Sequence, residues 1–165
     1  IEINLNLSGP QDTNTGGTDT LTGIENLVGG EFNDRFIGTP GANRLEMGAG
    51  SNDGFGLGGD DVIVIGQDDT VTGGTGADTF TLGHWIPRGH QAEILDFSLA
   101  EDALMVIYDD TVDTDPVVTL DPDKDDADLQ HLLLNGVRIA AISGAAGLTL
   151  DAITLFPESA LPPGS

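Results

Sequence analysis

The chain of 165 residues contains no cysteine, and only five Lys and Arg residues stand against 28 Asp and Glu, a formal net charge of −23. The absence of cysteine excludes disulfides, thiolate metal sites and thiol catalysis. So few basic residues exclude a nucleic-acid-binding protein, which needs a basic surface to neutralise phosphates, and they disfavour adsorption on anionic membranes. Because no apolar run approaches 18 residues, no membrane-spanning segment is expected.

Low hydrophobicity combined with high net charge is typical of disordered chains. Here Leu, Ile, Val and Phe supply 46 of the 165 residues, above the roughly 20% below which disorder is expected, so a packed core is possible. The chain begins at Ile1 with neither a methionine nor a charged leader followed by an apolar segment, so we expect no signal peptide here. We expect instead a piece of a longer protein, with a parent polypeptide upstream of residue 1.

Glycine is concentrated in one stretch, with 14 glycines in residues 29–81 and 6 in residues 82–165. This stretch divides into five blocks of nine residues and one of eight: 29–37, 38–46, 47–55, 56–64, 65–72 and 73–81. The sixth position carries an acid or amide in every block: Asp34, Asn43, Asn52, Asp61, Asp69 and Asp78. The eighth position is large and apolar in all but one block: Phe36, Leu45, Gly54, Ile63, Val71 and Phe80. A further block, 20–28, keeps the same phase.

A fixed nine-residue period indicates a repeated structural unit. Glycines at the first, second and fourth positions permit a tight turn with positive φ, and the last three residues alternate as a short strand does. We therefore predict an all-β fold, a parallel β-roll in which the inward apolar residues of successive strands stack into one core. A β-rich, β-sandwich-like capping region is expected to follow it.

The turns of such a roll concentrate backbone carbonyls and one side-chain oxygen each. Oxygen ligands without His or Cys suit a hard cation, and calcium accepts six to eight of them. If consecutive strands alternate sides, Asp61 faces Asn43 and Asp78, while Asn52 faces Asp34 and Asp69. Any single block is equally well explained by the preference of Gly, Asn and Asp for turns, but that explanation accounts neither for six blocks in phase nor for the charge.

Two blocks carry a known pattern. The nonapeptide G-G-x-G-x-D-x-U-x, with U a large apolar residue, is matched at all specified positions by GGTGADTFT (73–81) and at all but one by GLGGDDVIV (56–64). At these residues the chain resembles the RTX (repeats-in-toxin) hemolysin-type calcium-binding repeat family. The segments DTLTGIENLVGG (19–30) and GADTFTL…AEILDFSLAEDALMV (76–106) also resemble RTX modules, and imply a β cap similar to that of serralysin-type proteases and alginate epimerase modules. The candidate Ca2+ ligands are Asp34, Asn43, Asn52, Asp61, Asp69 and Asp78, with the turn residues Gly56, Gly58, Gly73 and Thr75.

The blocks also depart from the family pattern. Asn43 and Asn52 offer an oxygen without a charge, and Phe32 and Leu57 occupy glycine positions. Gly54 stands where the core needs a large residue, so we expect that layer to be underfilled or covered by Phe55. Fewer calcium ions than turns are therefore expected, with the stack of Asp61 and Asp78 as the best site.

The second half of the chain is expected to be β. Apolar or alternating runs occupy residues 91–97, 103–108, 116–120, 129–134 and 137–142, and the last two flank Asn135-Gly136, the favoured two-residue hairpin turn. A solenoid needs a cap over its open edge. We accordingly divide the chain into a lead-in strand and degenerate first repeat (1–28), an RTX β-roll (29–81), a β-rich cap (82–156), and a tail or linker (157–165).

The cap offers few candidate sites. Residues 109–128 hold nine Asp against one Lys; they do not meet the EF-hand pattern, and a solvated acidic loop is favoured over a specific site. In the family, the Asp96 and Asp102 positions belong to the junction of roll and cap, where the resemblance allows a further calcium. His84, His90 and His131 lack zinc spacing, and Trp85 is interpreted as a packing residue. No catalytic motif is found, so the chain itself is not expected to be an enzyme.

The leading interpretation is a calcium-binding RTX module, the C-terminal part of an exported protein. The resemblance implies a chain that stays unfolded at low cytosolic calcium, leaves a Gram-negative-type bacterium through type I secretion machinery, and folds on binding Ca2+ outside the cell or at its surface. Asp151 followed by AITLF resembles the ending of such secretion signals and is equally well explained as a final strand. The alternative is an extracellular adhesion or glycan-binding module in which calcium is only structural.

Overall fold

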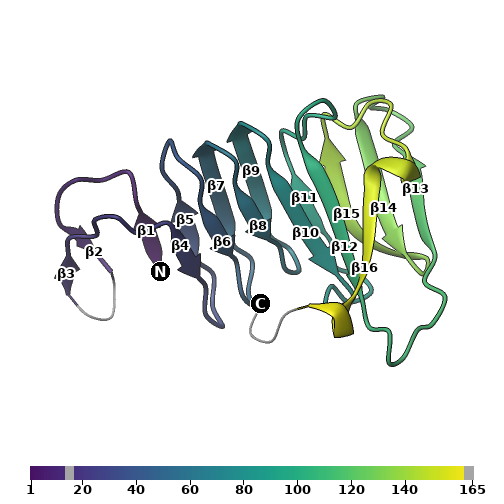
Figure 1. The fold of residues 1–165 in the computed structure, drawn as a ribbon, viewed down its shortest axis with the longest axis horizontal. Helices are drawn as coiled ribbons and strands as arrows, with labels where there is room; N and C mark the ends of the chain where they lie inside the picture. Colours follow the sequence, from purple (N-terminus) through teal and green to yellow (C-terminus); the bar gives the residue numbers. More distant parts are fainter. Residues whose placement is uncertain (14–16, 162–165) are drawn as a thin grey trace.

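The computed structural model describes residues 1–13 and 17–161, and its regular structure there consists of β-strands and two short 3-10 turns (Figure 1). Eight strands form one sheet, called here the long sheet, in the order β1 (Glu2–Asn4), β5 (Arg35–Ile37), β7 (Asp53–Gly58), β9 (Thr70–Thr75), β11 (Ala92–Ile94), β15 (Val137–Ser143), β14 (Leu129–Leu134) and β13 (Val118–Pro122). Six form the short sheet, in the order β16 (Ile153–Pro157), β12 (Ala103–Tyr108), β10 (Thr79–Gly83), β8 (Val62–Val64), β6 (Arg44–Glu46) and β4 (Asn26–Val28).

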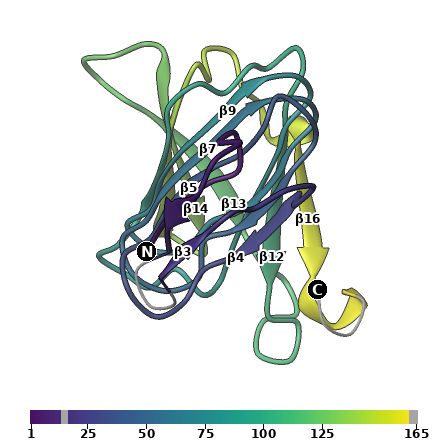
Figure 2. The same cartoon turned by 90° about the vertical axis from the view of Figure 1, so that its left-hand side faces the viewer.

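The chain winds as the nine-residue period predicts. From β4 to β12, consecutive strands alternate between the two sheets, and each strand pairs in parallel with the strand two blocks away. The register aligns eighth positions with one another, so that Leu45 pairs with Ile63 and Ile63 with Phe80. Seen from the N-terminal end, the windings lie one behind another (Figure 2). The prediction of an all-β parallel roll is confirmed.

The core lies between the two sheets and is built from the eighth positions. Phe36, Leu45, Ile63, Val71 and Phe80 are all buried. Such stacking removes apolar surface from water at about 25 cal/mol per Å2, the main favourable term in folding.

The layer at Gly54 is filled differently from what the sequence suggested. A Cβ built on Gly54 would lie 3.0 Å from Sδ and 3.1 Å from Cε of Met47, which is fully buried. Met47 therefore occupies the space, and the expectation of an underfilled or Phe55-covered layer was wrong. Phe55 is only half-buried and carries the Arg35 guanidinium 4.6 Å from its ring centroid.

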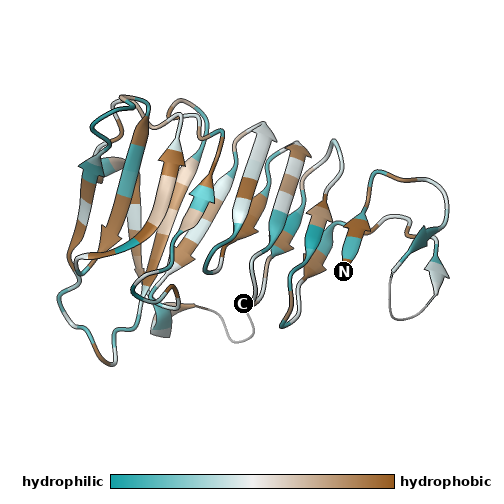
Figure 3. Cartoon of the chain, turned by 180° about the vertical axis from the view of Figure 1, so that it is seen from behind, coloured by the Kyte–Doolittle hydropathy of each residue, from teal (hydrophilic) through white to brown (hydrophobic). Residues whose placement is uncertain are grey.

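Both sheets continue into the C-terminal half. β11 joins β9 to β15, while β12 and β16 extend the short sheet beyond β10. Asn135 and Gly136, with φ of 53° and 75°, form the predicted hairpin turn between the antiparallel β14 and β15. These two strands are largely buried and rich in apolar residues (Figure 3).

The remaining elements lie at the ends of the chain. β2 (Gln11–Asp12) and β3 (Thr18–Asp19) pair with each other, and the 3-10 turns are η1 (Leu150–Ala152) and η2 (Glu158–Ala160). The division at 28/29, 81/82 and 156/157 stays a prediction; of the expected tail, residues 162–165 lie outside the described residues, as do 14–16 of the lead-in. None of the described segments forms a helix long and apolar enough to cross a membrane.

Candidate metal centre

The turns of the roll stack along two edges. Edge I is defined by the turns that run from the long sheet to the short sheet: 38–43, 56–61, 73–78 and 95–102. Edge II is defined by the turns that run from the short sheet to the long sheet: 29–34, 47–52 and 65–69. Edge I carries Asn43, Asp61 and Asp78, and edge II carries Asp34, Asn52 and Asp69, so the structure places the six side chains in the two expected columns. All six are buried, with 6% exposure or less.

Hydrogen bonds link the turns of edge I. The backbone N–H of Asn43 donates to Oδ1 of Asp61 at 2.7 Å, and that of Asp61 donates to Oδ1 of Asp78 at 2.9 Å. The N–H of Asp78 donates in turn to Oδ1 of Asp102 at 2.9 Å. Each carboxylate thus fixes the position of the preceding turn, which makes the column one connected unit.

Edge II repeats this pattern. The N–H of Asp34 donates to Oδ1 of Asn52 at 2.7 Å, and the N–H of Asn52 donates to Oδ1 of Asp69 at 2.9 Å. The Asn52 side chain adds a second bond, from Nδ2 to the same Asp69 oxygen at 2.8 Å. Oδ1 of Asp34 accepts from the amino group of Ile1 at 2.8 Å.

The two edges differ in whether the second carboxylate oxygen, Oδ2, accepts a hydrogen bond. On edge II, Oδ2 of Asp34 accepts from the N–H of Gly30 at 2.9 Å, and Oδ2 of Asp69 accepts from that of Gly66 at 2.6 Å. On edge I, Oδ2 of Asp61 and Oδ2 of Asp78 are buried and have no hydrogen-bond partner. The only other such side-chain atom among the described residues is Nδ1 of His131.

The ends of the edge I column are closed. Oδ1 of Asn43 accepts from the N–H of Thr39 at 2.6 Å, and Oδ2 of Asp102 accepts from the N–H of Ser98 at 2.8 Å. The two open oxygens therefore belong to the two consecutive turns in the middle of the column. A buried acceptor without a partner costs about 1–3 kcal/mol, so two of them in consecutive turns make the middle of the column a candidate binding site.

Local backbone conformation explains why these two oxygens lack a donor. In the turns of Asp34, Asn43 and Asp69, the N–H of the second residue (Gly30, Thr39 or Gly66) donates to an oxygen of that side chain and seals it. In the turns of Asp61 and Asp78 the second residue has positive φ, 81° at Leu57 and 104° at Gly74. The N–H of Gly74 donates to Oδ2 of Asp96 at 2.8 Å instead of to Asp78. β7 continues through Leu57, which pairs with Gly74 of β9 and donates no hydrogen bond to Oδ2 of Asp61.

Glycine at the first position brings backbone against the carboxylates. A Cβ built on Gly56 would lie 2.1 Å from Oδ2 of Asp61 and 2.5 Å from the carbonyl oxygen of Gly73. One built on Gly73 would lie 2.2 Å from Oδ2 of Asp78. Oxygens from two consecutive turns therefore converge on a space that only glycine leaves open.

Gly58 and Thr75, the remaining predicted ligands, lie opposite each other in the strand register of β7 and β9. Their position two residues beyond Gly56 and Gly73 places their carbonyls on the same edge of the roll. The ten predicted ligand residues thus fall into a set around Asp61 and Asp78 on edge I, with Asn43 at its sealed end, and a separate set on edge II.

The charges on edge I are not compensated by protein cations. Burial raises the pKa of Asp61 to about 6, and the neighbouring Asp78 and Asp60 carboxylates add to the shift. Burial also raises the pKa of Asp78, which lies beside Asp102 and Asp96. Among the described residues, no Lys, Arg or His forms an ion pair with any of these five side chains.

These residues fit a hard cation. In the part of the chain that the structure describes, no group of three or more His, Asp or Glu side chains is arranged to hold a metal. An ion at either Asp61 or Asp78 would therefore take its remaining ligands from backbone carbonyls. An all-oxygen set of carboxylates and carbonyls is the donor chemistry of calcium.

The junction residues flagged in the sequence have a different surrounding. Asp96 accepts from the N–H groups of Gly73 and Gly74 at 2.9 and 2.8 Å, and Asp102 accepts from those of Asp78 and Ser98. Both carboxylates bind the first strands of the cap to the last turn of the roll. Asp60 was not singled out by sequence reasoning, although its position beside Asp61 was the available signal; its Oδ1 accepts from the N–H of Ala77 at 2.9 Å.

The acidic loop and the aromatic residue of the cap have ordinary partners. Asp123 accepts from the N–H groups of Asp125 and Asp126, as turn carboxylates do. Nε1 of Trp85 donates to the carbonyl of Ile65 at 2.9 Å, and the ring lies against Gly83, where a Cβ would come within 2.4 Å of it.

Comparison with known proteins identifies the fold and no more. No family model and no curated protein matches the sequence. Among solved structures, the chain is similar to the AlgE6R3 subunit of the mannuronan C5-epimerase from Azotobacter vinelandii, with a TM-score of 0.56 and 22% sequence identity. The similarity covers 82% of this chain and 86% of that one, so it extends over roll and cap together, and the chain has the fold of that epimerase module.

Proposed function

We propose that this chain is a calcium-binding RTX module whose ions bind on edge I of the roll. The observation that carries the proposal is the pair of buried, unpartnered carboxylate oxygens, Oδ2 of Asp61 and Oδ2 of Asp78. They belong to the two blocks that match the RTX nonapeptide, and carbonyls of Gly56, Gly58, Gly73 and Thr75 lie on the same edge. The bound ions supply the positive charge that no protein side chain provides there.

Calcium binding is coupled to folding in this proposal. Without an ion, five carboxylates repel one another on edge I, and the glycine-rich turns lose much backbone entropy when they order. The free energy of ion binding then becomes free energy of folding. The module is a folding and stabilising unit rather than an enzyme.

The coupling gives such a module a use in export. An acidic, cysteine-free chain that folds only when calcium is abundant can pass a type I secretion channel unfolded and fold outside the cell. This assigns the chain to the extracellular side or the surface of a Gram-negative-type bacterium, attached to a parent polypeptide that carries the activity. The RTX nonapeptides, the composition and the shared fold support the assignment.

Circular dichroism of the purified chain, titrated with calcium, tests the proposal. The expected result is a cooperative gain of β signal with calcium and no comparable gain with magnesium, because magnesium demands a tighter octahedral geometry and keeps its water. A chain that is fully folded in chelator and unchanged by calcium would refute it.

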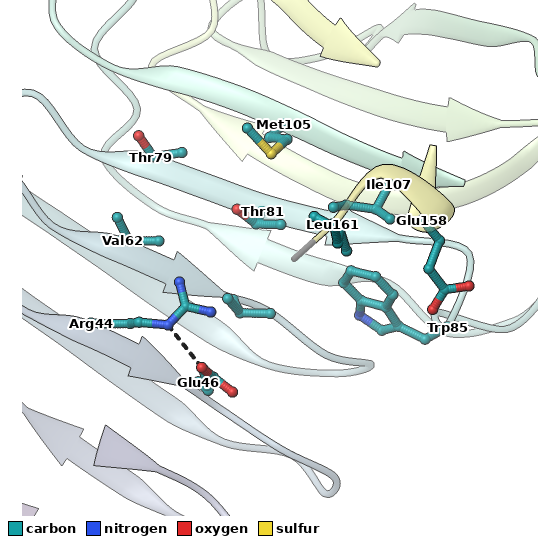
Figure 4. Close-up of a pocket in the computed structure, with 11 residues that line it drawn as sticks. Arg44, Glu46, Val62, Thr79, Thr81, Trp85, Met105, Ile107, Glu158 and Leu161 are labelled. Atoms are coloured by element: carbon teal, nitrogen blue, oxygen red, sulfur yellow. Dashed lines mark hydrogen bonds and ion pairs between the residues drawn. The ribbon is translucent and has the colours of Figure 1, made fainter. Parts of the chain in front are cut away.

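A groove on the outer face of the short sheet favours a second candidate, an extracellular adhesion module that binds glycans. The groove has a volume of about 470 Å3 and lies between Arg44 and Glu46 at one end and Trp85 with Leu161 at the other (Figure 4). Val62, Val64, Met105 and Ile107 make its floor apolar, whereas the Thr79 and Thr81 hydroxyls have no hydrogen-bond partner among the described residues. A fixed indole ring, free hydroxyls and an arginine are groups that can bind the apolar face and the hydroxyls of a sugar ring.

The net charge of −23 disfavours polyanionic glycans, so the candidate ligand is a neutral oligosaccharide. A glycan array in saturating calcium, with Trp85→Ala as the matched variant, tests it. Binding of neutral glycans that the variant loses would support the second function. Equal signals from both proteins would refute the role of the groove.

A further inference from the structure

We infer that the two edges of the roll differ in metal binding. Calcium binds on edge I alone, and the turns of edge II are closed by hydrogen bonds that need no ion. The inference rests on the proposed calcium function and deepens it, because the sequence period by itself assigns equivalent roles to the sixth-position residues of both edges.

The first observation is that the acceptors of edge II are satisfied. Asp69 receives two hydrogen bonds on Oδ1 from Asn52 and one on Oδ2 from Gly66, at 2.6–2.9 Å. Oδ2 of Asp34 receives one from Gly30. An ion on this edge would have to displace backbone donors that already bind the oxygens it needs. On edge I, by contrast, Oδ2 of Asp61 and of Asp78 are free of such donors.

The second observation is the charge sequence of each column. On edge I, Asp61, Asp78 and Asp102 follow one another, so each carboxylate faces another carboxylate. On edge II, the neutral amide of Asn52 separates Asp34 from Asp69 and donates to the latter. The partial positive charge of the Asn52 Nδ2 group therefore stabilises the Asp69 carboxylate, whereas the hydrogen bonds that Asp61 and Asp78 accept come from backbone N–H groups alone.

The third observation concerns the first position of each turn. On edge I it is glycine at 38, 56 and 73, and at 56 and 73 the missing Cβ leaves room beside the open carboxylate oxygens. On edge II it is glycine only at 29, in the turn whose Asp34 carboxylate accepts from Gly30. In the edge II turns of Asn52 and Asp69 it is Met47 and Ile65, whose side chains are fully buried in the core. The turn at 65–69 is also one residue shorter than the others. Neither turn keeps the glycine-lined space found at Gly56.

Calcium stoichiometry measured by isothermal titration calorimetry tests the inference. The wild-type chain is expected to bind two ions, one for each unpaired oxygen. Asp61→Asn and Asp78→Asn on edge I are expected to lower that number. The same substitution on edge II, in Asp34→Asn and Asp69→Asn, should leave the number unchanged, while Asp69→Asn reduces resistance to urea because its new amide meets N–H donors.

The outcomes separate the inference from the proposed function. A wild-type chain that binds no calcium refutes both. Calcium binding with more than two ions in the wild type, or loss of an ion in a folded edge II variant, overturns the asymmetry and leaves the calcium function intact. Because the wild-type number is itself decisive, an edge II variant that fails to fold does not block the test.

Discussion

Replacing Asp61 by asparagine is expected to change stability in opposite directions with and without calcium. Oδ2 of Asp61 and the carbonyl oxygen of Gly73 both face the space at Gly56. The amide Nδ2 that the substitution introduces would donate to that carbonyl, while Oδ1 continues to accept from Asn43. Removing one buried, unsatisfied acceptor is worth about 1–3 kcal/mol, and the charge beside Asp78 disappears as well. In chelator, Asp61→Asn should therefore raise the free energy of unfolding by about 1–3 kcal/mol.

In saturating calcium, Asp61→Asn should instead lower the free energy of unfolding. A site with calcium at about 100 times its Kd adds about 2.7 kcal/mol to the free energy of unfolding, and the variant loses this contribution at one site. The assay is urea unfolding followed by circular dichroism, in chelator and in saturating calcium, with Asp69→Asn as the matched control on edge II. That control should be less stable than the wild type in both conditions, because both of its oxygens accept N–H groups. If Asp61→Asn lowers stability in chelator, or keeps the full calcium increment, the reasoning about its unpaired oxygen is refuted.

The pH dependence in chelator follows from the same residue. The folded-state pKa of Asp61, about 6, exceeds the ordinary value of 3.8, so between these pH values the folded chain binds more protons than the unfolded chain. Its free energy of unfolding in chelator therefore falls as the pH rises from about 4 through about 6. Urea unfolding across this range should show a smaller fall with pH in Asp61→Asn than in the wild type, and an equal fall would count against the role of Asp61. Gly56→Ala forces a Cβ against Oδ2 of Asp61 and the Gly73 carbonyl and should abolish the calcium increment in thermal unfolding, whereas Gly30→Ala, where a Cβ meets nothing within 4 Å, should keep it. Met47→Ala empties the layer that Gly54 leaves unfilled and should lower the free energy of unfolding by about 2–5 kcal/mol in urea titrations; a loss below about 1 kcal/mol would show that the layer collapses around the gap.

The two columns of sixth-position side chains could be predicted from the sequence, because in a solenoid residues at the same position of the repeat lie against one another in neighbouring windings. Once the strands alternate between two sheets, residues 17 or 18 apart must become neighbours, and Asp61 must lie against Asn43 and Asp78. The hairpin turn at Asn135-Gly136 could also be predicted, since both residues tolerate positive φ. In these cases the residues that fix the contact are local in sequence or repeat in phase.

The sequence could not predict which carboxylates accept a hydrogen bond on Oδ2, because this depends on the direction of a single backbone N–H group. Thr39 and Leu57 both replace a glycine at the second position, and the pattern treats them alike. Thr39 donates to Asn43, whereas Leu57 adopts φ of 81° and does not donate to Asp61. An L-residue pays about 1–2 kcal/mol for a left-handed conformation, and here the pairing of Leu57 with Gly74 holds it. That conformation is set by the neighbouring winding rather than by the residue.

The first position of each turn connects the proposed metal site with the core. Where it is Met47 or Ile65, the side chain enters the core, and the turn closes on hydrogen bonds. Where it is Gly56 or Gly73, no side chain enters the core, and the open carboxylate faces a space that suits an ion. A first-position glycine is not sufficient for an open carboxylate, because the turns that begin at Gly29 and Gly38 are closed by the N–H groups of Gly30 and Thr39. An open turn therefore needs both a first-position glycine and a second residue whose N–H does not donate to the carboxylate. Under the proposed function, edge II is held by hydrogen bonds and core packing, and edge I is completed by calcium.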